Sequence, residues 1–185
     1  MLKYALTTAL LGLITLPAVA QETPHAAYRE TGSNQDWVGI YSPDRGTEKP
    51  TSSCAIYSRP KTKAVFEDGS EVEAMRGELA AFISWNGETP SGKSGEVSFM
   101  VGLPVEEGVD KGHVLTVDGD ENFELAGIDD RLYVMPEDDA TAIAAIRGGI
   151  DMVVTAKARD GRVVKDGYSL LGVQNMTVLS KQECR

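Results

Sequence analysis

The chain has 185 residues, of which 42% are hydrophobic and 6% aromatic, and its formal net charge is −10 at pH 7. This length is enough for one domain with a sizeable buried core. The excess of acidic side chains repels phosphate groups, so we expect neither nucleic acid nor an anionic lipid surface as a partner.

The first 20 residues carry the pattern of a signal peptide. Lys3 provides a short basic start, an apolar run over 4–16 follows, and Ala18-Val19-Ala20 has small residues at a cleavage position. The run is shorter than the ~18 apolar residues that a spanning helix needs, and no later stretch is apolar enough to cross a bilayer. We therefore expect an exported chain that begins near Gln21 and has no transmembrane segment.

A polar segment and then a series of short strands follow along the chain. Residues 21–35 show no periodicity, and we expect them to form a mobile N-terminal arm. From residue 36 onward, runs of β-branched and aromatic residues alternate with turn residues, and Trp37 and Trp85 are expected in the core. These runs predict strands near 36–41, 54–57, 79–85, 96–101, 113–117, 122–125 and 131–134. The interval 61–78 is instead expected to be a long charged connection.

A short helix is predicted within residues 136–149. Acidic residues at 137–139 lie where negative charge stabilises the start of a helix. Gly148-Gly149 is expected to end the helix by adopting a positive φ. We expect the apolar stripe of this helix to pack on the hairpin that follows, and a second short helix to lie within 172–184.

The register of that hairpin can be predicted from its side chains. A two-residue turn would pair the apolar Ala156 with a lysine, whereas a three-residue loop at 159–161 pairs Ala156 with Val164. The second register keeps most apolar side chains on one face, so we prefer it. It leaves one mismatch, because it sets the charged Asp166 opposite Val154.

Repeated short strands with turn residues between them are typical of antiparallel sandwiches and barrels. We therefore expect residues 36–185 to form a single, mostly β domain, an antiparallel sandwich or barrel with one or two short helices. The sequence contains no internal repeat and no linker that would divide this region.

Candidate catalytic and metal-binding residues are few. The histidines of the exported chain, His25 and His113, stand in no recognisable nucleophile motif, so a structural or surface role is the favoured interpretation. The segment from Asp118 to Asn122 loosely matches the first half of a calcium loop, but Phe123 occupies the position that requires glycine. A solvated hairpin turn is the better interpretation there. No phosphate loop and no zinc-binding spacing occurs, so we expect no cofactor and no metal.

Arg59, Lys61 and Lys63 form a compact basic group. This group could contact an acidic partner, but a solvated loop is the favoured interpretation, because isolated surface charges contribute little.

The chain contains two cysteines, Cys54 and Cys184. In an oxidising compartment an even number of cysteines favours pairing. A bridge between them would span 130 residues of chain, which the chain-entropy model values at about 4–5 kcal/mol. The alternative is a reactive thiol or a metal ligand, although no CxxC motif and no nearby histidine cluster supports it.

Several short segments together carry a family resemblance. They are Ser58–Lys61 after Cys54, Glu96–Ser98, Gly102–Pro104, Val117–Gly119, Phe123–Leu125, Ala144–Gly149, Met152–Val154, Arg159–Gly161, Gly167–Gly172 and the terminal Cys184. Through these segments the chain resembles the invasion-associated locus B family of exported bacterial envelope proteins over most of residues 37–184.

This resemblance implies an immunoglobulin-like antiparallel β-sandwich in the periplasm, associated with the outer membrane, or secreted. It implies an association with host-cell invasion in pathogenic members and a general envelope role in others. It transfers no catalytic residue and no cofactor, and it carries over only Cys54 and Cys184, as a structural disulfide.

The expected function is therefore that of a non-enzymatic module that binds a protein or a cell-envelope component. One alternative is a periplasmic, hydrolase-like enzyme with a site built from dispersed acidic residues, and another is a small-ligand carrier with an apolar cavity between the sheets. A deep pocket with two converging carboxylates would favour the enzyme, whereas a flat or edge-strand surface would favour the binding module.

Overall fold

The computed structural model describes residues 29–42, 53–86 and 95–183. The expected signal peptide at 1–20, His25 and Cys184 lie outside these ranges.

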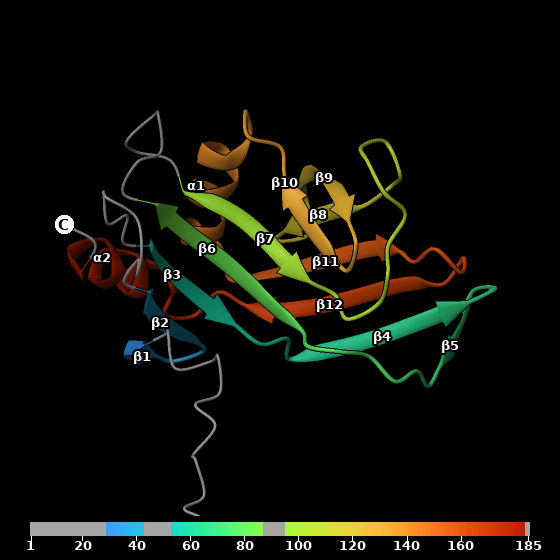
Figure 1. The fold of residues 1–185 in the computed structure, drawn as a ribbon, viewed down its shortest axis with the longest axis horizontal. Coiled ribbons are helices and arrows are strands. Elements are labelled where there is room, and N and C mark those ends of the chain that lie inside the picture. The colour runs from blue at the N-terminus through green and yellow to red at the C-terminus, as the bar shows by residue number, and fades with distance from the viewer. Residues whose placement is uncertain (1–28, 43–52, 87–94, 184–185) are drawn as a thin grey trace, which may run out of the picture.

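The described chain is mostly β, with short strands and two short helices (Figure 1). The strands are β1 (Arg29–Asn34), β2 (Trp37–Ser42), β3 (Ser53–Ser58), β4 (Thr62–Glu67), β5 (Ser70–Val72), β6 (Ala80–Asn86), β7 (Glu96–Met100), β8 (Val114–Val117), β9 (Glu121–Ile128), β10 (Arg131–Val134), β11 (Asp151–Lys157) and β12 (Val163–Ser169). The helices are α1 (Asp139–Gly148) and α2 (Val173–Glu183). Each of the seven strands predicted from hydrophobic alternation has a counterpart among these strands, so those predictions are confirmed.

All pairings between these strands are antiparallel, in the order β1-β2-β3-β6-β7-β10-β9-β8-β11-β12-β4-β5. The long strand β9 joins two layers, since Glu121–Glu124 pair with β8 and Leu125–Ile128 pair with β10. We call β1, β2, β3, β6, β7 and β10 the front layer, and β8, β11, β12, β4 and β5 the back layer. The sandwich-like antiparallel architecture is confirmed, while its immunoglobulin-like character stays a prediction.

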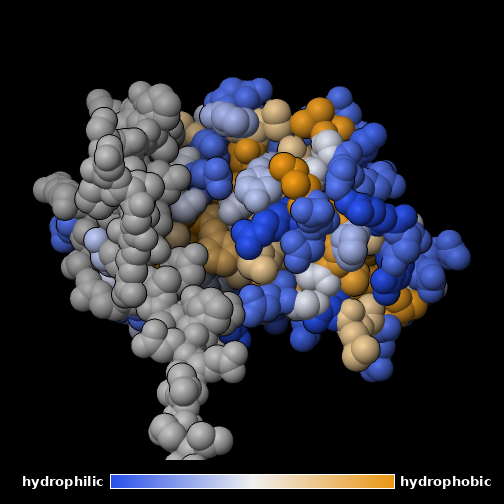
Figure 2. Space-filling view, viewed as in Figure 1, coloured by the Kyte–Doolittle hydropathy of each residue, from blue (hydrophilic) through white to orange (hydrophobic). Residues whose placement is uncertain are grey.

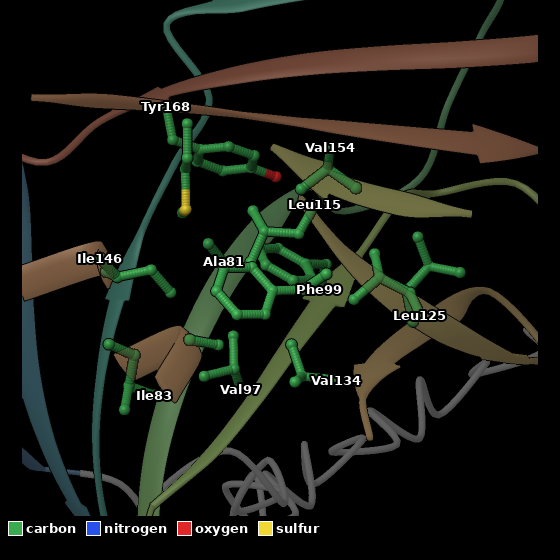
Figure 3. Packing of buried hydrophobic residues seen from close by; sticks show 14 of the residues in the cluster. Ala81, Ile83, Val97, Phe99, Leu115, Leu125, Val134, Ile146, Val154 and Tyr168 are labelled. Atoms are coloured by element: carbon green, nitrogen blue, oxygen red, sulfur yellow. The ribbon is translucent and has the colours of Figure 1, made fainter. Parts of the chain in front are cut away.

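The hydrophobic core lies between the two layers (Figure 3). The facing side chains include Ala81, Ile83, Val97 and Phe99 of the front layer and Leu115, Val154 and Tyr168 of the back layer. Trp37 is fully buried and its indole N–H donates to the Ser169 carbonyl at 3.0 Å, as its predicted core position requires. Burying one large apolar side chain is worth about 1.5–3 kcal/mol, so this shared core holds the layers together.

The hairpin of β11 and β12 has the predicted register. Ala156 pairs with Val164 and Met152 pairs with Tyr168, and all four side chains are buried. Gly161 adopts a φ of 89° in the three-residue loop, a conformation that glycine reaches without strain. The mismatch of Asp166 opposite Val154 is also present, and it is resolved by an ion pair described below.

Two segments expected to lack strands prove to contain them. Arg29–Asn34 of the expected arm form β1, which pairs with β2, and the interval 61–78 contains the hairpin of β4 and β5. The sequence of β1, Arg-Glu-Thr-Gly-Ser-Asn, has no apolar alternation to reveal it. These strands form because neighbouring strands offer backbone hydrogen bonds, and that contribution depends on tertiary pairing.

Both helices lie where they were predicted, but the details differ. The main contacts of α1 are with β7 and α2 rather than with the following hairpin. Helix α1 ends at Gly148, and Gly149 is extended with a φ of −83°, so the expected positive φ is wrong. In α2, Met176 is buried, while Val178 and Leu179 are about half exposed. Neither helix is long and apolar enough to cross a membrane, which holds for the described ranges.

Candidate binding groove on the front layer

A groove of about 1030 Å³ runs across the outer face of the front layer. It is lined by outward-facing residues of β1, β2, β3, β6, β7 and β10, and by the segments that connect β3 to β4 and β5 to β6. In the orientation of Figure 2, hydrophobic surface in the middle of the molecule is bordered by hydrophilic side chains.

Strand alternation explains which side chains line the groove. In β6, Ala81 and Ile83 point into the core, so Phe82 and Ser84 point outward. The same alternation in β7 buries Phe99 in the core and turns its neighbours toward the groove. The groove is therefore the second face of strands whose first face builds the core.

The strand register orders the groove residues into rows that run across the strands. The middle row is aromatic: Tyr133 pairs with Ser98, Ser98 with Phe82, and Phe82 with Tyr57. The rings of Tyr57 and Phe82 lie with centroids 6.1 Å apart and are tilted by 33°. We call this set, Tyr133, Ser98, Phe82 and Tyr57, the aromatic row.

A second row carries acidic residues at its two ends. Glu96 pairs with Ser84, Ser84 with Ala55, Ala55 with Ile40, and Ile40 with Glu30. We call this set the acidic row. Its two carboxylates are separated by four strand spacings, which is about 19 Å along the sheet. They are therefore too far apart to act as a pair on one reacting group.

The third row lies on the opposite side of the aromatic row and is basic. Arg131 pairs with Met100, and Met100 pairs with Ala80. Arg59 extends this row, because it follows Ser58, which pairs with Ala81 beside Ala80. We call Arg131, Met100, Ala80 and Arg59 the basic row.

The basic group predicted from the sequence borders the basic row. Arg59, Lys61 and Lys63 all line the groove, where the chain crosses from β3 to β4. Lys61 forms an ion pair with Asp36, and this hydrogen bond is the main reason why the pKa of Asp36 is lowered, with a second contribution from Ser169. Among the described residues, no ion pair engages Arg59 or Lys63, so both remain able to meet an anionic group.

The aromatic row was not anticipated from the sequence. Tyr57, Phe82 and Tyr133 each occupy the outward position of a strand whose other face is apolar. An aromatic residue at an outward position was the available signal, but only the cross-strand register brings three such residues together.

His113 is fully buried and structural. Its Nδ1 accepts the Lys157 backbone N–H at 3.1 Å, and its Nε2 donates to the Glu106 carbonyl at 2.8 Å. Because Nδ1 accepts a backbone N–H, the ring N–H of His113 lies on Nε2. Both ring nitrogens are thus occupied by backbone groups.

The segment resembling a calcium loop is a hairpin turn. Asp118 and Gly119 adopt φ values of 49° and 84°. The Asp118 carboxylate accepts the backbone N–H groups of Ile150 and Asp151 at 2.8 and 3.1 Å, and these bonds lower its pKa. Within the described residues no group of three or more acidic, histidine or cysteine side chains is arranged to hold a metal ion.

The charged Asp166 inside the back layer is neutralised by Arg76. The guanidinium donates to both carboxylate oxygens at 2.7 and 2.5 Å and to the Val101 carbonyl at 2.9 and 2.6 Å. The side chains of Arg76 and Asp166 are 5% and 0% exposed. Arg76 thereby ties the segment between β5 and β6 to both layers. Burial, together with the nearby Asp166, raises the pKa of Tyr168, which points into the same region.

Asp139 is the acidic residue of the first helical turn that the structure buries. Its Oδ1 accepts the Val97 backbone N–H at 2.9 Å. Burial raises its pKa to about 6, and the charges of Glu96 and Asp138 add to this effect, while the Val97 hydrogen bond opposes it. Asp139 thus lies in the first turn of α1, as predicted, but its carboxyl group is also desolvated. It lies near the Glu96 end of the acidic row.

Cys54 is buried in β3, and its side chain is 1% exposed. No cysteine among the described residues is free. The pairing of Cys54 with Cys184 stays a prediction, because Cys184 lies outside the described ranges.

Comparisons of this chain with protein-family models, with curated proteins and with solved structures find no match.

Proposed function

We propose that this chain is an exported, non-enzymatic binding module of the invasion-associated locus B type, with the front-layer groove as its binding surface. The partner is a protein or a cell-envelope component, met in the periplasm or at the outer surface. The associated role is in envelope function, and in host-cell invasion where the organism is a pathogen.

The observation that carries this proposal is the aromatic row on the solvent side of a sheet. Tyr57, Phe82 and Tyr133 keep part of their surface exposed, and all three line the groove. Aromatic residues are enriched in protein interfaces, because they bury a large area at a low cost in conformational entropy. An outward row that carries three of them across four strands is therefore better explained by binding than by the stability of the isolated domain.

The geometry of charged groups favours binding over the enzymatic alternative. The carboxylates of Glu30 and Glu96 stand about 19 Å apart along the sheet, by four strand spacings, and the ring nitrogens of His113 serve backbone groups. The core in Figure 3 is filled by side chains from both layers, which disfavours the small-ligand carrier.

The proposal includes an immunoglobulin-like fold closed by a bridge between Cys54 and Cys184. Helix α2 packs on β1, β2 and β3, and β3 carries the buried Cys54. Helix α2 ends at Glu183, and Cys184 is the next residue in the sequence, which supports the proposed bridge. Mass mapping of non-reduced peptides tests this bridge, and two thiols that react with an alkylating reagent would contradict it.

Site-specific photo-crosslinking in intact cells tests the binding surface. A photo-reactive residue at Phe82 samples the groove, and the same residue at Val153, on the outer face of the back layer, is the matched control. We expect one adduct that forms from Phe82 and not from Val153, and that is lost when Tyr133→Glu is added. Its partner, once identified and purified, must crosslink again from Phe82. Equal adducts from both positions, or none from Phe82, would contradict the proposal.

A further inference from the structure

Resting on the proposed function, we infer that the groove binds an extended peptide of another protein that carries a basic residue, an apolar residue and an acidic residue at alternate positions. The basic residue meets the acidic row, the apolar residue meets the aromatic row, and the acidic residue meets the basic row.

The spacing of the rows matches the spacing of an extended chain. Ser84, Phe82 and Ala80 belong one to each row, and they are successive outward positions of β6. Alternate residues of a strand are about 6.7 Å apart, so the three rows span about 13 Å. A peptide laid along β6 presents every second side chain to the sheet with the same repeat.

The charges at the two ends of the groove are opposite. One end carries Glu30 and Glu96, and the latter lies close enough to Asp139 to raise its pKa. The other end carries Arg131 and Arg59, with Lys63 beyond them.

Two acidic residues, Glu78 and Asp36, reduce the positive charge at the basic end of the groove but do not reverse it. Glu78 also lines the groove at the basic end, and Lys61 is partly neutralised by Asp36. The basic end still carries more positive than negative groups in a chain whose net charge is −10.

The middle of the groove is formed by the aromatic row, in which Ser98 is almost fully buried. Ser98 stands between Phe82 and Tyr133 in the aromatic row, so a small residue separates two large rings. An apolar side chain inserted over Ser98 would contact both rings. Such an aromatic-lined position at the centre of an interface is where binding free energy concentrates.

This arrangement favours a polypeptide over a polysaccharide. An anionic polysaccharide would meet the basic row but would be repelled by Glu30 and Glu96, and a neutral one would gain nothing from either charged row. A polypeptide places both signs of charge at fixed separations, so it can satisfy all three rows at once.

Four synthetic peptides test the inference against the intact exported chain. In each, serine alternates with three test residues, of which the middle one is leucine. The outer two are lysine and glutamate, two lysines, two glutamates or two glutamines. We expect the mixed-charge peptide to bind about fivefold more tightly than either like-charged peptide at low salt, measured by fluorescence anisotropy. The advantage should shrink as salt is added.

Charge-reversed variants provide the matched control. In the double variant Glu30→Lys and Glu96→Lys, we expect the preference to move to the peptide with two glutamates. In the double variant Arg59→Glu and Arg131→Glu, we expect it to move to the peptide with two lysines. All four positions face solvent in the groove, so the melting temperature of each variant, measured in parallel, should stay near that of the parent chain.

The outcomes separate this inference from the proposed function. Equal binding of the four peptides, unchanged preferences in the variants, or tighter binding of polygalacturonate than of the mixed-charge peptide would each overturn the inference. If photo-crosslinking from Phe82 still captures a partner in those cases, the groove remains the binding surface and only the class of occupant is wrong. Absence of both peptide binding and crosslinking would overturn both.

Discussion

Replacing Arg76 by methionine should destabilise the protein by about 3–5 kcal/mol, because it removes one partner of a buried ion pair. The guanidinium makes two hydrogen bonds to Asp166 and two to the Val101 carbonyl. The variant Arg76→Met keeps most of the apolar length of the side chain but leaves a carboxylate that is 0% exposed without its counter-charge. The loss is a large fraction of the roughly 5–15 kcal/mol by which a domain is normally stable.

A double-mutant cycle measured by urea denaturation checks this reasoning. We expect Arg76→Met alone to lose about 3–5 kcal/mol, and the pair Arg76→Met with Asp166→Leu to lose much less, because two apolar side chains can replace a buried ion pair. The exposed pair of Arg159 and Glu107 is the control, and breaking it with Glu107→Gln, which leaves the Arg159 bond to the Val105 carbonyl in place, should cost less than about 1 kcal/mol. A loss below about 1 kcal/mol for Arg76→Met, or strict additivity in the cycle, would refute the assigned role.

Three further predictions concern other buried contacts. Gly149→Ala should cost about 1–3 kcal/mol in thermal unfolding, because a Cβ there would lie 2.9 Å from both Leu170 and Val117; Gly148→Ala, whose Cβ would meet nothing within 4 Å, should be neutral or stabilising. Equal losses would contradict this packing. His113→Phe should cost about 2–3 kcal/mol by urea denaturation, since it leaves two backbone groups without their partner. A neutral result would mean that water replaces the ring nitrogens. The pKa of Asp139 is raised from 3.8 to about 6, so its ionisation costs stability as pH rises through this window. Relative to the parent chain, Asp139→Asn should therefore gain up to about 3 kcal/mol between about pH 4 and pH 7, and a flat difference across that range would contradict burial as the cause.

Local pattern was sufficient for most of the strands and for one complete hairpin. The apolar alternation on both sides of Asp160-Gly161 predicted the pairing of Ala156 with Val164, and even the mismatch at Asp166. These predictions succeed because turn geometry and the two-residue period of a strand act over a few neighbouring residues.

Other elements depend on partners that are distant along the chain. Strand β1 has no apolar alternation and exists through its pairing with β2. The partner of Asp166 is Arg76, which lies 90 residues earlier in a segment expected to be a charged connection. Gly149 was predicted to need a positive φ, and it does not adopt one. It is glycine because the side chains of Leu170 and Val117 leave no room for a Cβ.

The mostly β architecture, the hairpin and both helices could be predicted from the sequence, because they follow from interactions between neighbouring residues. The groove could not, because it exists only once separate strands are paired. Tyr133, Phe82 and Tyr57 come from three separate strands, and the residues next to each of them in the sequence do not indicate that they form a row. Strand register creates the row, since a shift of one residue in any of these strands would turn its aromatic side chain into the core and leave no binding surface.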